Sequence, residues 1–159
     1  MKRPAAYAIF VGGGIAATLD IVYALTFWFF YRSVAPVAVL QTISGGLLGL
    51  PTARAGGAAT ALLGLGLHYA IAFAMAAAFF IASRYFRFLT QRPIVAGVLY
   101  GVVLYAIMNF AVLPLSALPA HAWKPTLPAL TDLCSHMFFV GMPIALATRR
   151  AFAAQKVAD

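Results

Sequence analysis

Four long apolar stretches dominate this sequence, at about residues 5–31, 57–83, 93–115 and 126–148. A helix needs about 20 residues, at about 1.5 Å each, to cross the hydrocarbon core of a bilayer, and every stretch exceeds that length. The chain is 64% hydrophobic and 9% charged, whereas a soluble domain carries about 25% charged residues. The sequence therefore predicts an all-α membrane protein, in which residues 1–159 form one four-helix transmembrane bundle without a soluble domain.

The basic residues predict the direction of the four spans. Eight of the eleven Lys and Arg residues flank the side that carries both termini and the connection near residue 87, and three flank the other side. By the positive-inside rule, both termini are cytoplasmic. Because the basic residues sit at the ends of apolar stretches, we expect the lipid bilayer as the partner, and no nucleic acid. We predict a location in a bacterial cytoplasmic (inner) membrane, and the excess of Arg over Lys together with abundant Ala is typical of a GC-rich genome.

The connection at residues 36–49 is apolar but too short to cross a membrane. It predicts a short segment between the first two spans that is either an interfacial helix on the outer surface or a re-entrant lid over a cavity. Gln41 and Ser44 lie three positions apart, so a helix here would have one polar edge.

Five polar residues within the spans carry most of the functional information. Counted from the outer ends of the spans, Asp20, His68 and His136 lie near the middle of the bilayer, and Asn109 and Asp132 lie closer to its outer surface. A charged group in the hydrocarbon costs about 2.5–3.5 kcal/mol, so these side chains should face the bundle interior. Asp132 and His136 are four positions apart and share a helix face. We therefore expect an inward-facing Asp/His polar cluster in the outer half of the bilayer.

Four interpretations of this cluster remain open. It is a hydrogen-bond network that fixes helix register, or the site of a proton-coupled transporter of a small solute or ion, with Asp20 as the proton carrier. It is alternatively a Zn or Fe site whose candidate ligands are Asp20, His68, Asp132 and His136. The last alternative is a haem b held by His68 and His136. No catalytic motif is present, so we predict no catalytic residue and no enzyme activity.

The remaining features concern helix packing. Gly97 and Gly101 form a GxxxG spacing that permits close helix approach, either within the chain or in a homodimer. Cys134 is the only cysteine, and we expect it to be a small buried residue. Pro143 should disturb the fourth helix, because proline lacks the backbone N–H.

Three sequence elements resemble a known group of proteins. They are His68 within GLHYAIAFAMA, the LPLSALP end of the third span, and the pair Asp132 and His136 at the start of the fourth. In this order they resemble the small, uncharacterised four-helix bacterial inner-membrane proteins of the YagU-like kind. The resemblance implies an inner-membrane location and a unit formed by His68, Asp132 and His136, and it implies no particular role for that unit.

Overall fold

The computed structural model describes residues 2–119 and 123–158, and every regular element within those ranges is helical. Four helices are long and apolar enough to cross a membrane: Pro4–Arg32, Gly57–Tyr85, Pro93–Leu115 and Leu127–Ala154. The four predicted spans are therefore confirmed as helices. The fourth extends past residue 148 because the Ala- and Arg-containing segment that follows it still favours a helix.

Three of these four helices contain a π-helical turn. The π-helical turns are labelled η. The first long helix comprises α1 (Lys2–Ala6), η1 (Tyr7–Gly12) and α2 (Gly13–Arg32), and the second is α5 (Gly57–Tyr85). The third comprises α7 (Pro93–Ile107), η2 (Met108–Val112) and α8 (Leu113–Leu115), and the fourth comprises α9 (Leu127–Ser135), η3 (His136–Gly141) and α10 (Met142–Ala158). The short helices of the connections are α3 (Pro36–Leu48), α4 (Leu50–Ala55) and α6 (Phe88–Gln91).

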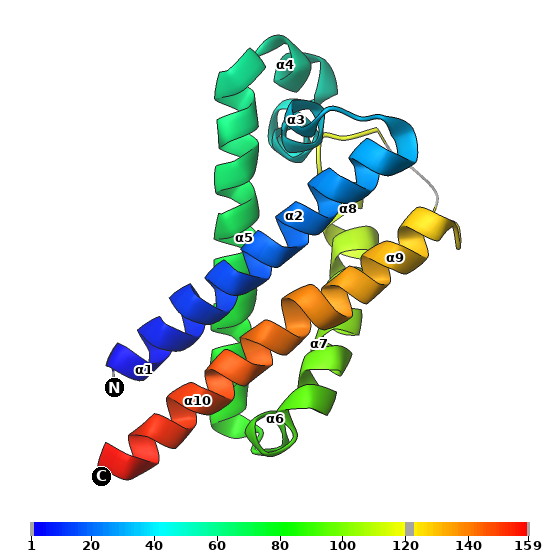
Figure 1. Cartoon of the computed structure of the whole chain (residues 1–159). Helices are drawn as coiled ribbons and strands as arrows, with labels where there is room; N and C mark the ends of the chain where they lie inside the picture. Colours follow the sequence, from blue (N-terminus) through cyan, green and yellow to red (C-terminus); the bar gives the residue numbers. More distant parts are fainter. Residues whose placement is uncertain (1, 120–122, 159) are drawn as a thin grey trace.

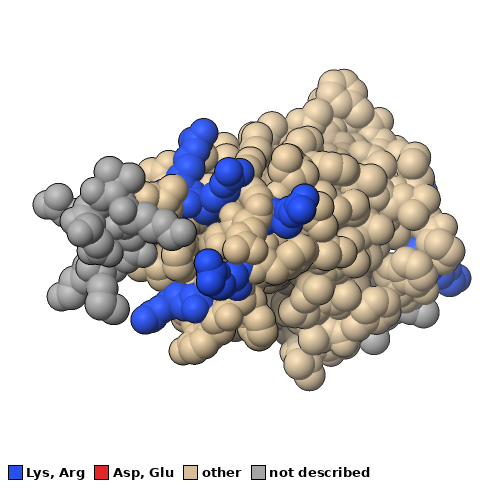
Figure 2. All heavy atoms as spheres, turned by 90° about the horizontal axis from the view of Figure 1, so that it is seen from below, with Lys and Arg blue, Asp and Glu red and all other residues tan. Residues whose placement is uncertain are grey.

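Both ends of the chain lie at one end of the bundle, together with α6 (Figure 1). We call this the basic end and the opposite end, where α3 and α4 lie, the distal end. Figure 2 shows blue basic side chains gathered on the basic end and no acidic side chain in that view. The exposed arginines beside α6 and in the last helix, α10, are Arg84, Arg87, Arg92, Arg149 and Arg150.

The third and fourth helices cross at very close range through glycines. A Cβ added to Gly97 would lie 2.8 Å from the Cα of Met142, and one added to Gly101 would overlap the backbone of His136. Gly141 faces Gly97 from the other helix in the same way. The close approach predicted for Gly97 and Gly101 is thus confirmed as a contact within the chain. It fixes the backbone of His136 against α7.

The half of the bundle toward the basic end is closed by small, branched aliphatic and aromatic side chains. Phe79, Ile144 and Ala145 are almost fully buried in one cluster. The Tyr100 hydroxyl donates to the Met75 carbonyl at 2.8 Å, which ties α7 to α5. This packing seals the basic half, whereas the polar residues lie nearer the distal end.

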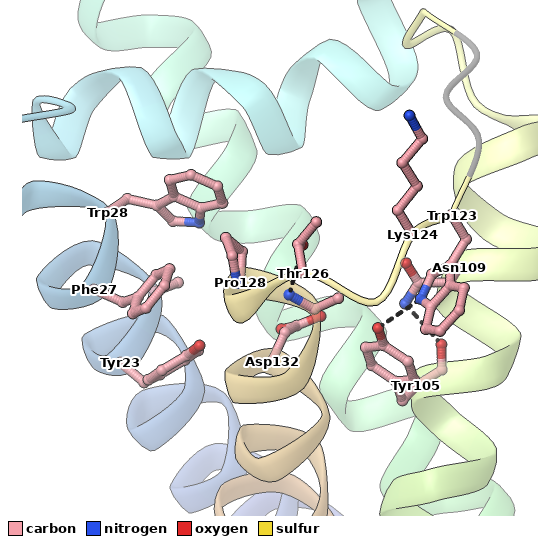
Figure 3. Close-up of a pocket in the computed structure, with 12 residues that line it drawn as sticks. Tyr23, Phe27, Trp28, Tyr105, Asn109, Trp123, Lys124, Thr126, Pro128 and Asp132 are labelled. Atoms are coloured by element: carbon pink, nitrogen blue, oxygen red, sulfur yellow. Dashed lines mark hydrogen bonds between the residues drawn. The ribbon is translucent and has the colours of Figure 1, made fainter. Parts of the chain in front are cut away.

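Helix α3 lies across the distal end of the bundle, seen end-on in Figure 1 and lengthwise in Figure 3. Its polar edge faces inward, because Gln41 and Ser44 are both buried. The Gln41 amide donates to the Gly57 carbonyl at 3.0 Å, and Gly64 of α5 leaves room for the Leu40 carbonyl. Helix α3 is therefore a packed cover on the bundle.

Two smaller packing predictions had different outcomes. Cys134 is exposed, so the prediction that it is buried is wrong. The physical reason is that His136 turns inward, and a residue two positions away on a helix points to another face. The π-helical turn η3 ends just before Pro143, so the helix is irregular where the proline predicted a disturbance.

Candidate functional site

Three of the five predicted polar residues line one small cavity inside the bundle. Asp20 comes from α2, His68 from α5 and His136 from η3, and the cavity has a volume of about 130 Å³. The rest of its wall is apolar, and Ile43 of α3 lines it too. We call this the inner cavity. Three separate helices thus bring two imidazoles and one carboxylate to a single space.

Each of these side chains has its own hydrogen-bond partner. The Ser135 hydroxyl donates to Asp20 Oδ1 at 2.6 Å, and His68 Nε2 donates to the Ala17 carbonyl at 2.9 Å. A neutral His68 therefore carries its proton on Nε2 and leaves Nδ1 as an acceptor. No hydrogen bond among the described residues joins Asp20 directly to His68 or His136.

Sequence reasoning missed Ser135 as the donor to Asp20. A serine within an apolar helix commonly bonds to the carbonyl four residues earlier in its own helix. Ser135 is instead 2% exposed and reaches across to α2. The only available signal was its position beside His136.

Asp132 and Asn109 line a second, larger cavity near the distal end, which we call the outer cavity (Figure 3). Its volume is about 430 Å³. It is lined by Tyr23, Ala24, Phe27, Trp28, Tyr105, Asn109, Trp123, Lys124, Thr126, Pro128, Ala129 and Asp132. The Asn109 amide donates to the Tyr105 carbonyl at 3.0 Å, one turn earlier. The five predicted residues are therefore divided between two cavities.

The pair of Asp132 and His136 connects these cavities. His136 Nδ1 lies 2.9 Å from the Asp132 carbonyl oxygen and 3.5 Å from the carboxylate oxygen Oδ1. The Asp132 side chain is 43% exposed, whereas that of His136 is 10% exposed. His136 thus lines the inner cavity while its Nδ1 faces the carboxylate that lines the outer one.

Aromatic residues hold His136 in place from the outer side. The Tyr105 ring meets the His136 ring edge to face, with centroids 5.7 Å apart. The Trp123 indole N–H donates to the Tyr105 hydroxyl at 2.9 Å. This ring arrangement was absent from the sequence predictions, because Trp123 comes from the connection before α9, whose path the sequence does not specify.

The four candidate metal ligands do not form one site. The structure, over the part of the chain it describes, has no group of three or more His, Cys, Asp or Glu side chains that could hold a metal ion. Asp132 lines the outer cavity, while Asp20, His68 and His136 line the inner one. The Zn or Fe interpretation based on all four residues is therefore wrong for this arrangement.

A haem held by His68 and His136 does not fit either. Pockets for ligands of drug size have volumes of about 300–1,000 Å³, and the inner cavity between these histidines measures about 130 Å³. A porphyrin would have to displace the apolar walls and Asp20.

Comparison with protein families, with curated proteins and with solved structures finds no match for this chain. The resemblance to YagU-like proteins thus stays a prediction, and the site has to be interpreted from its own geometry.

Proposed function

We propose that this chain is a multi-pass protein of the bacterial cytoplasmic membrane that couples proton movement to the transport of a small solute or ion, and that it has no enzyme activity. Both termini would be cytoplasmic, with the distal end and α3 on the outer surface. The observation that carries the proposal is the Asp132–His136 pair, which joins a partly exposed carboxylate to the inner cavity, where two more titratable side chains lie.

The proposed proton path begins in the outer cavity. Asp132 receives a proton there. In the structure His136 Nδ1 already carries a proton, which it donates to the Asp132 backbone carbonyl. In the proposed relay the His136 ring turns its unprotonated nitrogen, Nε2, toward Asp132 to take up the proton, and it turns back to release that proton in the inner cavity, where Asp20 and His68 are the acceptors. Chains of Asp, Glu and His inside membrane segments are typical proton relays. Asp20 is the proposed carrier, because it is the carboxylate that lines the inner cavity and the Ser135 hydroxyl holds it in position there.

The bonds of Asp20 and His68 run between helices, to Ser135 and to the Ala17 carbonyl, and so also fix helix register. His136 instead bonds to the Asp132 backbone of its own helix, and it contributes no hydrogen bond between helices. The 43% exposure of the Asp132 side chain adds a route to the distal end. These features favour a titrating site over a purely structural network.

The arrangement corresponds to an outward-facing state in this proposal. The core around Phe79 and Ile144 closes the basic half, so release to the cytoplasm requires the helices to separate there. Thr148 in that half is fully buried, and its hydroxyl has no hydrogen-bond partner among the described residues. An unsatisfied buried hydroxyl costs about 1–3 kcal/mol, a cost that is relieved when this half opens to water.

Proton-coupled flux in liposomes tests the proposal. The protein is reconstituted around a pH-sensitive dye, and gradients of inorganic monovalent ions, amino acids and organic amines are applied in turn. We expect at least one solute to change the internal pH through the wild-type protein. Asp20→Asn should abolish that change while the protein still elutes as a folded species in gel filtration.

Asp159→Asn provides the matched control, since it removes the third acidic residue, at the chain terminus and outside the described residues. It should transport like the wild type. Unchanged proton flux in Asp20→Asn would contradict the proposal. A wild-type protein that moves no protons with any solute would instead favour the register-fixing network.

A further inference from the structure

The outer cavity combines aromatic rings with a single carboxylate, and we infer that it binds an organic ammonium ion. Its aromatic residues are Tyr23, Phe27, Trp28, Tyr105 and Trp123, and its carboxylate is that of Asp132. The face of an aromatic ring attracts a cation, most strongly where water is excluded. The inference rests on the proposed function for the role of this cavity, and it deepens that function by naming the class of solute.

The rings are held in fixed positions before any ligand binds. On α2, the Tyr23 and Phe27 rings stack with centroids 5.6 Å apart, and Phe27 meets Trp28 edge to face at 5.5 Å. On the opposite wall, the Trp123 indole donates to the Tyr105 hydroxyl at 2.9 Å. A preorganised wall spares the ligand the entropic cost of ordering these side chains.

The Asp132 carboxylate has capacity for a further partner. The nearer hydrogen-bond acceptor of His136 Nδ1 is the Asp132 backbone carbonyl, at 2.9 Å, and the carboxylate oxygen lies at 3.5 Å. Lys124 also lines the cavity, but Figure 3 shows its ammonium group pointing away from Asp132. Among the described side chains, no Lys or Arg forms an ion pair with this carboxylate.

The geometry favours an organic cation over a metal ion. Ca²⁺ takes about six to eight oxygen ligands, and the outer cavity offers one carboxylate, with no metal-holding group of three in the described part of the chain. A volume of about 430 Å³ is enough for an ammonium group with several carbon substituents.

The two tryptophans of the chain provide the signal for a binding experiment. Trp28 and Trp123 are the only tryptophans, and both line the outer cavity. The full chain is placed in phosphatidylglycerol nanodiscs and titrated with choline or with its uncharged carbon isostere, dimethylbutanol. We expect a saturable change in fluorescence with choline and none with the isostere. Asp132→Asn should weaken choline binding about tenfold, and Asp132→Glu should restore most of it.

A pair of substitutions on α2 tests the rings independently of the charge. Phe27→Leu removes a ring that lines the cavity, whereas Phe30→Leu removes a ring that is 80% exposed and lies outside it. We expect several-fold weaker choline binding for Phe27→Leu and wild-type binding for Phe30→Leu. Equal responses to choline and dimethylbutanol, or an unchanged affinity in Asp132→Asn, would overturn the inference.

A lipid headgroup and a free solute can both present an ammonium group to this cavity. One further titration distinguishes these two sources. In phosphatidylcholine nanodiscs, loss of the response to free choline would assign the site to the lipid headgroup, and a retained response would assign it to the solute. Binding is measured here without a gradient. Choline binding without proton flux would therefore contradict only the proposed transport, and proton flux without choline binding would contradict only this inference.

Discussion

Ser135 supplies the hydrogen-bond donor for the only carboxylate in the inner cavity. Its hydroxyl lies 2.6 Å from Asp20 Oδ1 and joins the fourth helix to the first. Polar contacts between membrane helices contribute about 0.6 kcal/mol on average and up to about 1.7 kcal/mol. Since this contact involves a carboxylate, its contribution should lie toward the upper end of that range.

We therefore predict that Ser135→Ala lowers the free energy of unfolding by about 1–2 kcal/mol, measured by titration with sodium dodecyl sulfate in mixed micelles. Ser83→Ala is the matched control, because Ser83 is also buried but its hydroxyl bonds only to the Phe79 carbonyl of its own helix, at 2.8 Å. That variant should unfold like the wild type. Equal losses in the two variants would show that the bond to Asp20 adds no stability.

At the scale of elements, the crossing of α7 with η3 determines where His136 lies. A side chain at Gly101 would collide with the backbone of His136 and Met137. We predict that Gly101→Ala lowers the free energy of unfolding by more than about 2 kcal/mol, because backbone on both sides would have to move. The same titration in mixed micelles measures it.

Gly66→Ala serves as the control for this prediction. Gly66 also lies within a spanning helix, but, apart from its chain neighbours and the nearby backbone of its own helix, no described atom lies within 4 Å of its would-be Cβ. Alanine has the higher helix propensity, by about 1 kcal/mol, so this variant should be neutral or slightly more stable. If Gly101→Ala changed the free energy of unfolding as little as Gly66→Ala, α7 and η3 would pack less closely than they do in the structure.

For α3, the sequence predicts that the segment is a helix but not which neighbour its polar side chains contact. Its helical character follows from an apolar segment that begins with Pro36, a residue favoured in the first turn of a helix. The burial of Gln41 does not follow, because its partner is a backbone carbonyl at the start of α5. Which neighbour accepts a polar side chain depends on tertiary packing, and one residue's identity does not encode it.

For the whole molecule, the strongest predictions came from length and hydropathy. The four spans could be predicted because a helix must cover a fixed membrane thickness, and Gly97 and Gly101 predicted a close crossing because only small residues permit one. Counting residues from the outer end of each span placed Asp20, His68 and His136 at a similar depth in the membrane, and these three line one cavity. The division into two cavities could not be predicted, since it depends on helix rotation and on the path of Trp123.

The topology of the whole chain is the remaining prediction that can be tested directly. In a Cys134→Ala background, which removes the only native cysteine, single cysteines are introduced as Arg54→Cys at the distal end and Arg87→Cys beside α6. Each replaces an exposed arginine, so the two variants are matched. If both termini are cytoplasmic, a membrane-impermeant maleimide should label Arg54→Cys in intact spheroplasts and label Arg87→Cys only after lysis.

The excess of basic residues near α6 is the physical reason for this expected pattern, because positively charged connections are retained in the cytoplasm. The reverse labelling pattern would invert the topology and place the outer cavity toward the cytoplasm, and the direction of proposed proton entry would then be reversed as well.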